Sequence, residues 1–300
     1  MTPRLAVDAQ AEPSALGALL AEVKKTLAAA GVEAADREAR WLIQHALGLT
    51  GSSQLLDGTR RVDSDGLAKV EALVVRRTAR EPLQYILGTQ EFCGLEFEVN
   101  PDVLIPRPET ELLAQEVIRR LPHGGRATVI DVGTGSGCLA VIFARAVPNA
   151  RIIATDLSAP ALETAKRNGL RHGVDKRISW LEGDLLAPVS DLCRERTVTA
   201  IMANPPYIRE SEWSGLQPEV GRYEPRTALV AGTKGTEIHE RLLDEAIPYL
   251  GPGGFLAMEI GQGQSDDIRR MIACRPAYDR TEVVPDGAGI DRIMIVQRGT

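Results

Sequence analysis

A loop with two successive prolines, Asn204-Pro205-Pro206-Tyr207, follows an apolar run and carries groups suited to holding a planar amino group. Each proline lacks the N–H that a strand ladder requires, so the loop is rigid and ends the preceding strand. The side-chain carbonyl of Asn204 and the main-chain carbonyl of Pro205 can both accept hydrogen bonds from one NH2 group. Tyr207 can then pack against a flat amide or base. The loop predicts a site that presents an amide or exocyclic amine, with an Asn-Pro turn and simple aromatic packing as the alternative.

A second segment combines an apolar strand with alternating glycines, Val129-Ile130-Asp131-Val132-Gly133-Thr134-Gly135-Ser136-Gly137. Glycine allows a sharp turn and a close approach of the backbone to a ligand. The third glycine comes one residue earlier than in the dinucleotide fingerprint, which would place it at Cys138. This G-x-G-x-G form, with Asp131 two residues before it, is typical of the S-adenosylmethionine loop of class I methyltransferases. A glycine-rich turn in an unrelated α/β protein is the alternative.

Two further acids end the next two apolar runs. Asp156 lies about 20 residues beyond the glycine loop, where doubly wound nucleotide-binding folds place the carboxylate that binds ribose hydroxyls. The alternative role for Asp156 is to cap the following helix, for which Ser158 competes. Asp184 occupies the strand end at which class I methyltransferases often hold the adenine amino group, although a plain turn explains it nearly as well.

These features occur in the order glycine loop, ribose acid, acceptor loop, and together they favour methyl transfer to an amide or exocyclic amine. The methyl sulfonium of S-adenosylmethionine is already activated, so the acceptor loop needs only to orient the nitrogen. No strong general base is therefore expected.

The elements around these motifs predict a doubly wound α/β domain after a small helical one. Apolar residues repeat at helical spacing in residues 14–80, and residues 81–108 form a connector with a β-hairpin between Gln90 and Val99. After a helix from Glu109 to about Arg120, strands alternate with helices that start near Gly137, Ser158 and Gly235, which indicates a parallel sheet covered on both faces. The expected strands are Thr128–Val132, Arg151–Thr155, Ile178–Leu181, Val198–Ala203, Phe255–Ile260, Tyr278–Val284 and Arg292–Gln297. The last two flank a short glycine-rich link, so they form an antiparallel edge pair and complete a mostly parallel seven-stranded sheet.

Composition excludes several functional classes. The net charge is −6, and no aromatic-basic cluster offers a surface for nucleic acid. No apolar run suggests a membrane span, and the acids Asp8 and Glu12 argue against a secretory signal. The four cysteines and four histidines show no metal-ligand spacing, so we expect free thiols in the cytoplasm and no metal. Those residues are Cys93, Cys138, Cys193, Cys274, His45, His123, His172 and His239.

With these motifs in view, residues 81–298 resemble the HemK/PrmC family, the protein-(glutamine-N5) methyltransferases that act on class 1 peptide chain release factors. The matching segments are Glu81–Gly88, Leu104–Leu112, the glycine loop, Asn204–Tyr207, Tyr223–Leu229 and Gly289–Arg292. Residues 1–80 fit the family's helical N-terminal domain in size and character. The resemblance implies three parts: a substrate-recognition domain (1–80), a connector (81–108) and a Rossmann-like class I methyltransferase domain (109–300).

The resemblance also implies the cofactor, the partner and the site residues. S-adenosylmethionine, with S-adenosylhomocysteine as product, would be bound by Asp131, Gly133, Thr134, Gly135, Ser136, Gly137, Asp156, Asp184, Leu185 and Asn204. The glutamine of the release factor's Gly-Gly-Gln loop would be held by Asn204, Pro205, Pro206 and Tyr207. Arg107 and Glu109 would line the substrate entrance or, as an equal alternative, anchor the segment before the helix. Leu185 departs from the family, which often has an aromatic residue there, so only apolar contact with adenine is implied.

Three other functions compete with this interpretation. A sister enzyme that methylates a glutamine of ribosomal protein L3 shares the Asn-Pro-Pro-Tyr loop but typically lacks the Pro-Glu-Thr found here at Pro108–Thr110. An adenine-N6 or guanine-N2 methyltransferase would fit the same loop but must also bind phosphates and flip a base, which the charge disfavours. A non-catalytic binding module would have little use for the full set of motifs. We expect a monomeric enzyme that does not bind nucleic acid or membrane; which release factor it prefers does not follow from the sequence.

Overall fold

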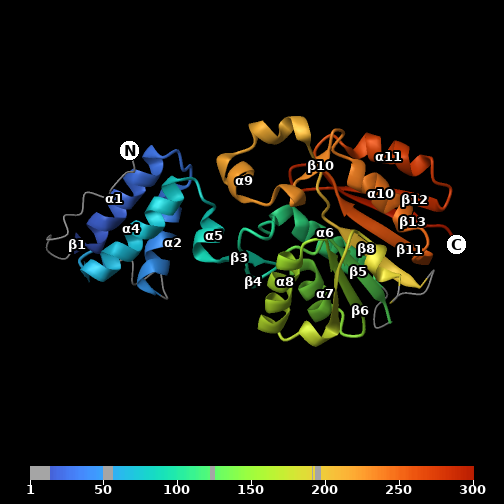
Figure 1. The fold of residues 1–300 in the computed structure, drawn as a ribbon, viewed down its shortest axis with the longest axis horizontal. Coiled ribbons are helices and arrows are strands. Elements are labelled where there is room, and N and C mark those ends of the chain that lie inside the picture. Colours follow the sequence, from blue (N-terminus) through green and yellow to red (C-terminus); the bar gives the residue numbers. More distant parts are fainter. Residues whose placement is uncertain (1–13, 50–56, 122–125, 191, 193–196) are drawn as a thin grey trace. The chain divides into compact units, whose positions relative to one another are not determined.

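The computed structural model describes residues 14–49, 57–121, 126–190, 192 and 197–300. Four residues discussed above, Asp8, Glu12, His123 and Cys193, lie outside these ranges. The chain forms two compact units: a helical unit up to Gly88 that also includes Gln217–Tyr223, and a sheet unit made of Thr89–Leu216 and Glu224–Thr300. Figure 1 labels most of the helices and strands of both units.

The helical unit is built from amphipathic helices, as their apolar spacing predicts. Its elements are β1 (Ser14–Ala15), α1 (Leu16–Ala29), α2 (Ala35–Leu47), β2 (Arg61–Val62), α4 (Ser64–Thr78), α5 (Leu83–Leu87) and α9 (Pro218–Tyr223). Leu27, Leu42 and Val70, from three different helices, are fully buried in one core. The Asp63 side chain caps α4 by accepting a hydrogen bond from the Gly66 N–H at 2.8 Å. Helix α5 was not expected from the sequence.

A buried ion-pair cluster holds α9 within the helical unit, although α9 comes from the middle of the second half of the chain. Glu219 of α9 accepts two hydrogen bonds from Arg80, at 2.7 and 2.8 Å, and one from Arg77 at 2.9 Å. Arg77 is only 5% exposed and also binds Glu38 of α2 at 2.6 Å. The Tyr223 hydroxyl donates to the Ala79 carbonyl at 2.8 Å. Paired charges with several hydrogen bonds therefore fix this short helix, which has no fully buried residue of its own.

The sheet unit contains the predicted seven-stranded sheet, in the order β12-β13-β11-β8-β5-β6-β7. Neighbouring strands from β11 to β7 are parallel, and β13 is antiparallel to both β11 and β12, as expected. The sheet strands are β5 (Thr128–Val132), β6 (Arg151–Asp156), β7 (Ile178–Glu182), β8 (Val198–Ala203), β11 (Leu250–Glu259), β12 (Tyr278–Pro285) and β13 (Asp291–Arg298). Two small pairs accompany it, the hairpin β3 (Thr89–Phe92) and β4 (Leu95–Glu98), and the parallel pair β9 (Ile208–Arg209) and β10 (Val230–Gly232).

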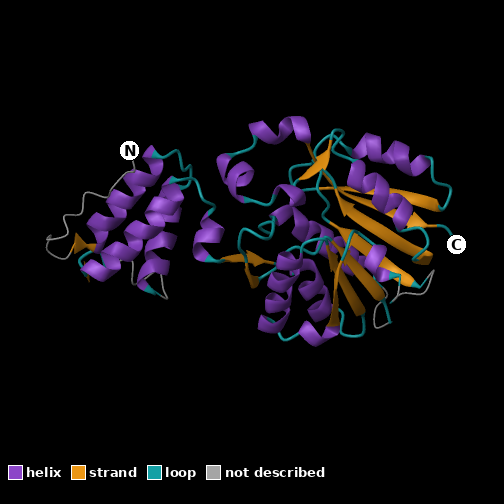
Figure 2. Cartoon of the chain, in the orientation of Figure 1, coloured by secondary structure: helices purple, strands orange, loops and turns teal. Residues whose placement is uncertain are grey.

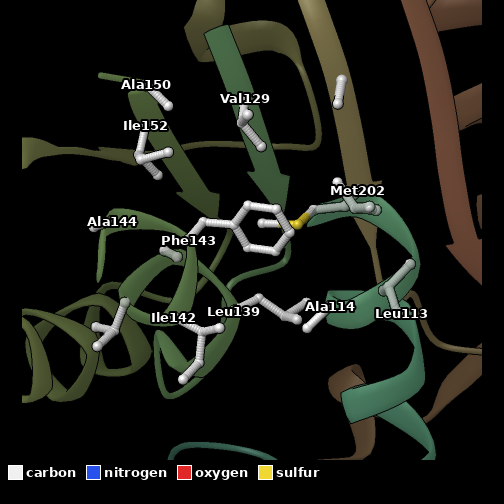
Figure 3. Packing of buried hydrophobic residues seen from close by; sticks show 14 of the residues in the cluster. Leu113, Ala114, Val129, Leu139, Ile142, Phe143, Ala144, Ala150, Ile152 and Met202 are labelled. Atoms are coloured by element: carbon white, nitrogen blue, oxygen red, sulfur yellow. The ribbon is translucent and has the colours of Figure 1, made fainter. Parts of the chain in front are cut away.

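Helices cover both faces of this sheet (Figure 2). They are α6 (Pro108–Arg120), α7 (Cys138–Ala146), α8 (Ala159–Arg171), α10 (Glu237–Glu245) and α11 (Ser265–Ala273), with 3-10 turns η1 (Asp175–Arg177), η2 (Ala187–Val189), η3 (Glu210–Gly215) and η4 (Arg226–Ala228). Alternate residues of each central strand enter opposite cores, because side chains alternate along a strand. Val129 and Met202 pack with Phe143 of α7 on one face, whereas Ile130 and Ile201 pack with α10 and α11 on the other. Figure 3 shows the Phe143 ring among the residues of the first core.

The structure departs from the sequence-based expectations at a few boundaries. Helix α6 begins at Pro108, one residue before the expected start, since proline fits the first turn of a helix. Strand β11 begins at Leu250 rather than Phe255, and its pairing with β8 shifts register over the glycine-rich start. Helix α11 was not expected. No helix in the described ranges is long and apolar enough to cross a membrane.

The ion-pair cluster gives the first testable prediction. Glu219→Ala leaves the nearly buried Arg77 with Glu38 as its one carboxylate partner among the described residues, so we expect the free energy of unfolding to fall by about 2–4 kcal/mol. Lys69→Ala is the matched control, because the Lys69–Asp65 pair is mostly exposed and its loss should change stability by less than about 1 kcal/mol. Urea denaturation of both variants measures the difference. Equal stability of the two variants would contradict a structural role for the cluster.

Candidate active site

The functional motifs meet at one edge of the sheet because three parallel strands end level with one another. The pairing register aligns Val132 of β5 with Thr155 of β6 and with Ala203 of β8. The residues that follow, Gly133, Asp156 and Asn204, therefore emerge side by side at the carboxyl edge, where open α/β sheets bind ligands.

A cavity of about 470 Å³ lies at this edge, which is a volume typical of small-molecule sites. Most of the sequence-predicted cofactor residues line it: Gly133, Thr134, Gly135, Ser136, Asp156, Asp184, Leu185 and Asn204. Of the predicted substrate residues, Asn204 and Pro206 line the cavity, whereas Pro205, Tyr207, Arg107 and Glu109 do not. The wall is completed by Pro101–Val103, which the sequence did not single out, and by Leu104 and Thr227–Ala228, which lie in segments that carry the family resemblance.

The glycine loop takes the backbone conformation for which glycine is suited. Gly133, Gly135 and Gly137 all have positive φ angles, of 70°, 56° and 78°. A side chain on Gly137 would lie 2.9 Å from the Cβ atom of Ala165 in α8, so this glycine allows close helix packing. No described atom lies within 4 Å of the Cβ position at Gly133 or Gly135, so these two leave open space for a ligand to approach the backbone.

Asp131 lies behind the glycine loop and does not line the cavity. Its Oδ2 atom accepts hydrogen bonds from the Thr134 hydroxyl at 2.6 Å and from the Ala140 N–H at 3.1 Å. The other oxygen, Oδ1, is buried and accepts no hydrogen bond from the described residues. Complete burial raises the pKa of Asp131 to about 7. Asp131 thus holds the loop and the start of α7 in place.

Asp156 faces the cavity and connects the glycine loop to the start of α8. Its Oδ2 accepts from the Gly135 N–H at 2.8 Å, and its Oδ1 accepts from the Ser158 N–H at 2.9 Å. Ser158 itself caps α8 by accepting from Ala161, so the capping function belongs to Ser158. Burial raises the pKa of Asp156. Each oxygen of its carboxylate has a second lone pair that can accept a hydrogen bond from a ligand. Its geometry fits a ligand with hydroxyl groups.

Asp184 and Leu185 form a tight turn after β7. Leu185 has a φ angle of +46°, which is uncommon for a residue with a side chain, and its carbonyl accepts from the Thr155 hydroxyl at 2.9 Å. Asp184 pairs with Arg241 of α10 at 2.8 Å and is about half exposed. Both line the cavity, and Leu185 provides an apolar surface there.

The acceptor loop is held from behind by Gln264, which the sequence did not single out. Its side-chain amide donates to the Tyr207 carbonyl at 2.9 Å and to the Gly235 carbonyl at 3.0 Å. Its Oε1 accepts from the Gly261 N–H at 2.9 Å. A buried glutamine that satisfies three main-chain groups makes the loop rigid.

Two buried residues to which the sequence interpretation assigned no role in the site, Thr110 and Glu259, also contact this loop. Thr110 accepts a hydrogen bond from the Asn204 amide nitrogen at 3.0 Å, and it donates to Glu259 at 2.7 Å. Glu259 follows the four apolar residues Phe255–Met258 and is the last residue of β11. A single acid at the end of an apolar strand was the sequence signal that could have identified it. Glu259 also accepts from the Tyr207 hydroxyl at 3.4 Å.

Arg107 and Glu224 form an ion pair beside α6. Glu224 is 6% exposed, and its second oxygen accepts from the Ile105 N–H at 3.4 Å. Burial raises the pKa of Glu224. These contacts support the anchoring role for Arg107, and Glu109, which is half-buried, remains a predicted substrate residue.

Among the described residues, no group of three or more His, Cys, Asp or Glu side chains could hold a metal ion.

Comparison with known proteins identifies the family. Residues 18–88 match the family model of the PrmC N-terminal domain, and residues 108–216 match that of the methyltransferase small domain. The release factor glutamine methyltransferase of Geobacter sulfurreducens is 42% identical over 89% of this chain and 91% of that protein. The protein of the same name from Nitratidesulfovibrio vulgaris is 39% identical over 94% of this chain and 95% of its own length.

Solved structures support the fold independently. The hMettl16 catalytic domain in complex with the MAT2A 3'UTR hairpin 6 aligns with a TM-score of 0.55 and 15% identity, covering 75% of this chain and 81% of that chain. This similarity shows the class I methyltransferase fold of the sheet unit. With relatives this similar over nearly its whole length, the chain belongs to the family of release factor glutamine methyltransferases.

Proposed function

We propose that this protein transfers the methyl group of S-adenosylmethionine to the side-chain amide nitrogen (N5) of the glutamine in the Gly-Gly-Gln motif of class 1 peptide chain release factors. The observation that carries the proposal is the position of Asn204. Its amide lies level with the glycine loop at the cavity edge and donates its NH2 to Thr110, so its oxygen is turned away from that bond. The names of the relatives support the same activity.

The glycine loop and Asp156 form the donor half of the site. S-adenosylmethionine supplies a methyl group already activated by the positive sulfonium. The backbone at Gly133 and Gly135 is open to it, Asp156 has lone pairs for its ribose hydroxyls, and Leu185 offers apolar contact to its base. The chain's contribution at this half is binding and orientation.

The acceptor loop forms the other half. Asn204 Oδ1 and the Pro205 carbonyl accept the two N–H groups of the glutamine amide, which turns the face of the nitrogen toward the methyl group. Methyl transfer forms the N–C bond while the S–C bond breaks, and one proton leaves the nitrogen to solvent. Burial raises the pKa of the Tyr207 phenol, so it stays protonated and acts as a packing surface rather than a base.

The other functions considered above are less favoured. The relatives are named for release factors rather than for a ribosomal protein. The similarity to an RNA-bound methyltransferase domain is at 15% identity and concerns the fold alone. The net charge of −6 disfavours a phosphate-binding surface, and we propose a monomer that acts on protein without binding nucleic acid.

Release factors act at the ribosome, so we place the enzyme in the cytoplasm, where its thiols Cys93, Cys138 and Cys274 stay reduced.

We further propose that residues 1–80 recognise the body of the release factor. A three-residue loop buries too little surface to distinguish one protein from another, so additional contacts are required. Trp41 in α2 is 42% exposed with the Arg37 guanidinium over its ring, and exposed aromatic residues commonly anchor protein interfaces.

Replacement of Asp156 tests the donor site. We expect Asp156→Ala to weaken S-adenosylmethionine binding by about 1.5–3 kcal/mol, because hydrogen bonds to a charged acceptor are lost. Calorimetry gives the dissociation constant. Asp175→Ala is the control, since this acid bonds the Trp180 indole and does not line the cavity. Unchanged donor affinity in Asp156→Ala would reduce Asp156 to a loop-bracing role.

Replacement of Asn204 tests the acceptor site. Asn204→Ala should lower kcat by on the order of 10²-fold while changing the donor dissociation constant much less, because the lost oxygen positions the target amide. The measurement is single-turnover methylation of purified release factor, with donor binding followed separately. A kcat close to that of the wild type would rule out the assigned role.

Replacement of Trp41 tests the recognition domain in the full-length chain. Trp41→Ala should raise KM for intact release factor by about tenfold and leave kcat and donor affinity unchanged. Leu170→Ala is the matched control, because Leu170 is 65% exposed on α8 of the sheet unit. If both variants have the wild-type KM, the surface around Trp41 does not contact the release factor.

A further inference from the structure

We propose that Thr110 and Glu259 are positioning residues that determine which end of the Asn204 side-chain amide faces the substrate. The inference rests on the proposed function, because it concerns how the acceptor loop presents a hydrogen-bond acceptor to an NH2 group. An asparagine amide has an oxygen and a nitrogen of nearly the same size, so its shape alone does not select the productive orientation.

Three elements bring these residues together. Glu259 is the last residue of β11, and the register pairs Met258 with Ala203, so Glu259 lies level with Asn204 at the sheet edge. Thr110 lies in the first turn of α6, which packs against both strands. Thr110 and Glu259 are 3% and 2% exposed, so both side chains are almost completely buried.

The chemistry of the groups fixes the direction of the hydrogen bonds. An ionised carboxylate can only accept hydrogen bonds. The single O–H of Thr110 therefore donates to Glu259 Oε2 at 2.7 Å. The Thr110 oxygen can then only accept a hydrogen bond from its other neighbour, Asn204. The Asn204 side chain must therefore turn its NH2 group toward Thr110, at 3.0 Å. The Asn204 oxygen is consequently directed away from Thr110, which is the orientation needed to accept from a substrate amide.

The direction depends on the charge of Glu259. Burial raises the pKa of Glu259 to about 7. Tyr207 donates to its other oxygen, Arg292 of β13 favours its charged form and Glu109 of α6 disfavours it. His239 of α10 donates to the main-chain carbonyl of Glu259 rather than to its carboxylate, and burial lowers the pKa of this histidine to about 4, so it remains neutral.

When Glu259 is protonated, it can donate to Thr110, and the hydroxyl proton can turn toward Asn204. The amide would then be favoured in the reversed orientation, with its NH2 group toward the substrate. Activity should therefore be present above the pKa of Glu259 and should fall as the pH drops through about 7.

The test compares variants of the full chain that keep or remove one link. Thr110→Val removes the hydroxyl at nearly constant shape, and Thr110→Ser restores it. Glu259→Gln removes the charge and leaves a group that can either accept or donate. Thr164→Val is the control, because Thr164 is a fully buried threonine in α8 whose hydroxyl bonds Asn100 and Pro160 outside this network.

We expect Thr110→Val to lower kcat at least tenfold with donor affinity and KM for release factor near their wild-type values, and Thr110→Ser to recover most of the loss. Thr164→Val should keep the wild-type kcat. Glu259→Gln should lower kcat and abolish its decline between about pH 8 and 6. A Thr110→Val enzyme as fast as the wild type, or a Glu259→Gln enzyme with the wild-type pH profile, would overturn the inference.

A readout without turnover separates this inference from the proposed function. The side-chain NH2 of Asn204, followed by ¹⁵N NMR, should exchange with solvent several-fold more slowly in the wild type and Thr110→Ser than in Thr110→Val. Equal exchange rates would overturn the inference even if methylation occurs. If release factor is not methylated by the wild type, the proposed function fails, and the exchange rates still decide whether Thr110 orients Asn204. Should Thr110→Val not fold, the exchange rate and pH profile of Glu259→Gln give the same decision.

Discussion

The level register of four parallel strands is the constraint on which the site depends. Val132, Thr155 and Ala203 lie in one row across β5, β6 and β8, and Met258 of β11 continues it. The next residue of each strand therefore belongs to the site or supports it. A shift of one strand by a single residue would turn its side chains to the other face and separate the glycine loop from the acceptor loop. Two cores, one on each face, hold this register.

Buried acids behind the cavity support this edge at an electrostatic cost. Asp131, Glu224 and Glu259 are each nearly or fully buried, and burial raises the pKa of each. Each carboxylate accepts a hydrogen bond in compensation: Asp131 from Thr134 and Glu259 from Thr110, both of which line the cavity, and Glu224 from the main chain of Ile105. Asp131 and Glu259, which do not line the cavity, thus hold in place the lining residues Thr134 and Thr110. Such bracing suits a reaction that requires orientation more than proton transfer.

The sequence predicted most of the fold because apolar runs and turn residues specify it locally. Strands β5 and β8 have the predicted bounds, since each is a mostly apolar run that is followed by turn residues, Gly133 after β5 and Asn204-Pro205 after β8. Helix α11 was missed because it buries only Ile268 and Ile272. Helix α9 was missed because distant arginines hold it through Glu219. The glycine loop, Asp156 and Asn204 could be found as motifs, whereas Glu259, Thr110 and Gln264 act through neighbours that only the folded sheet brings near.

The hydrogen bonds from Asn204 to Thr110 and from Thr110 to Glu259 explain why residue 204 is an asparagine. An aspartate there could accept hydrogen bonds from the NH2 group of the proposed substrate as well as an asparagine could. It would, however, direct a carboxylate oxygen at the Thr110 lone pairs, because the hydroxyl proton is already bound by Glu259. Two buried carboxylates would then compete for one proton, and the pKa of at least one would rise further. Asparagine avoids this conflict because it carries a donor for Thr110 and an acceptor for the substrate on one planar group. The neutral side chain of Asn204 and the buried carboxylate of Glu259 at the end of β11 are therefore a matched pair, and neither can be changed alone without disturbing the other.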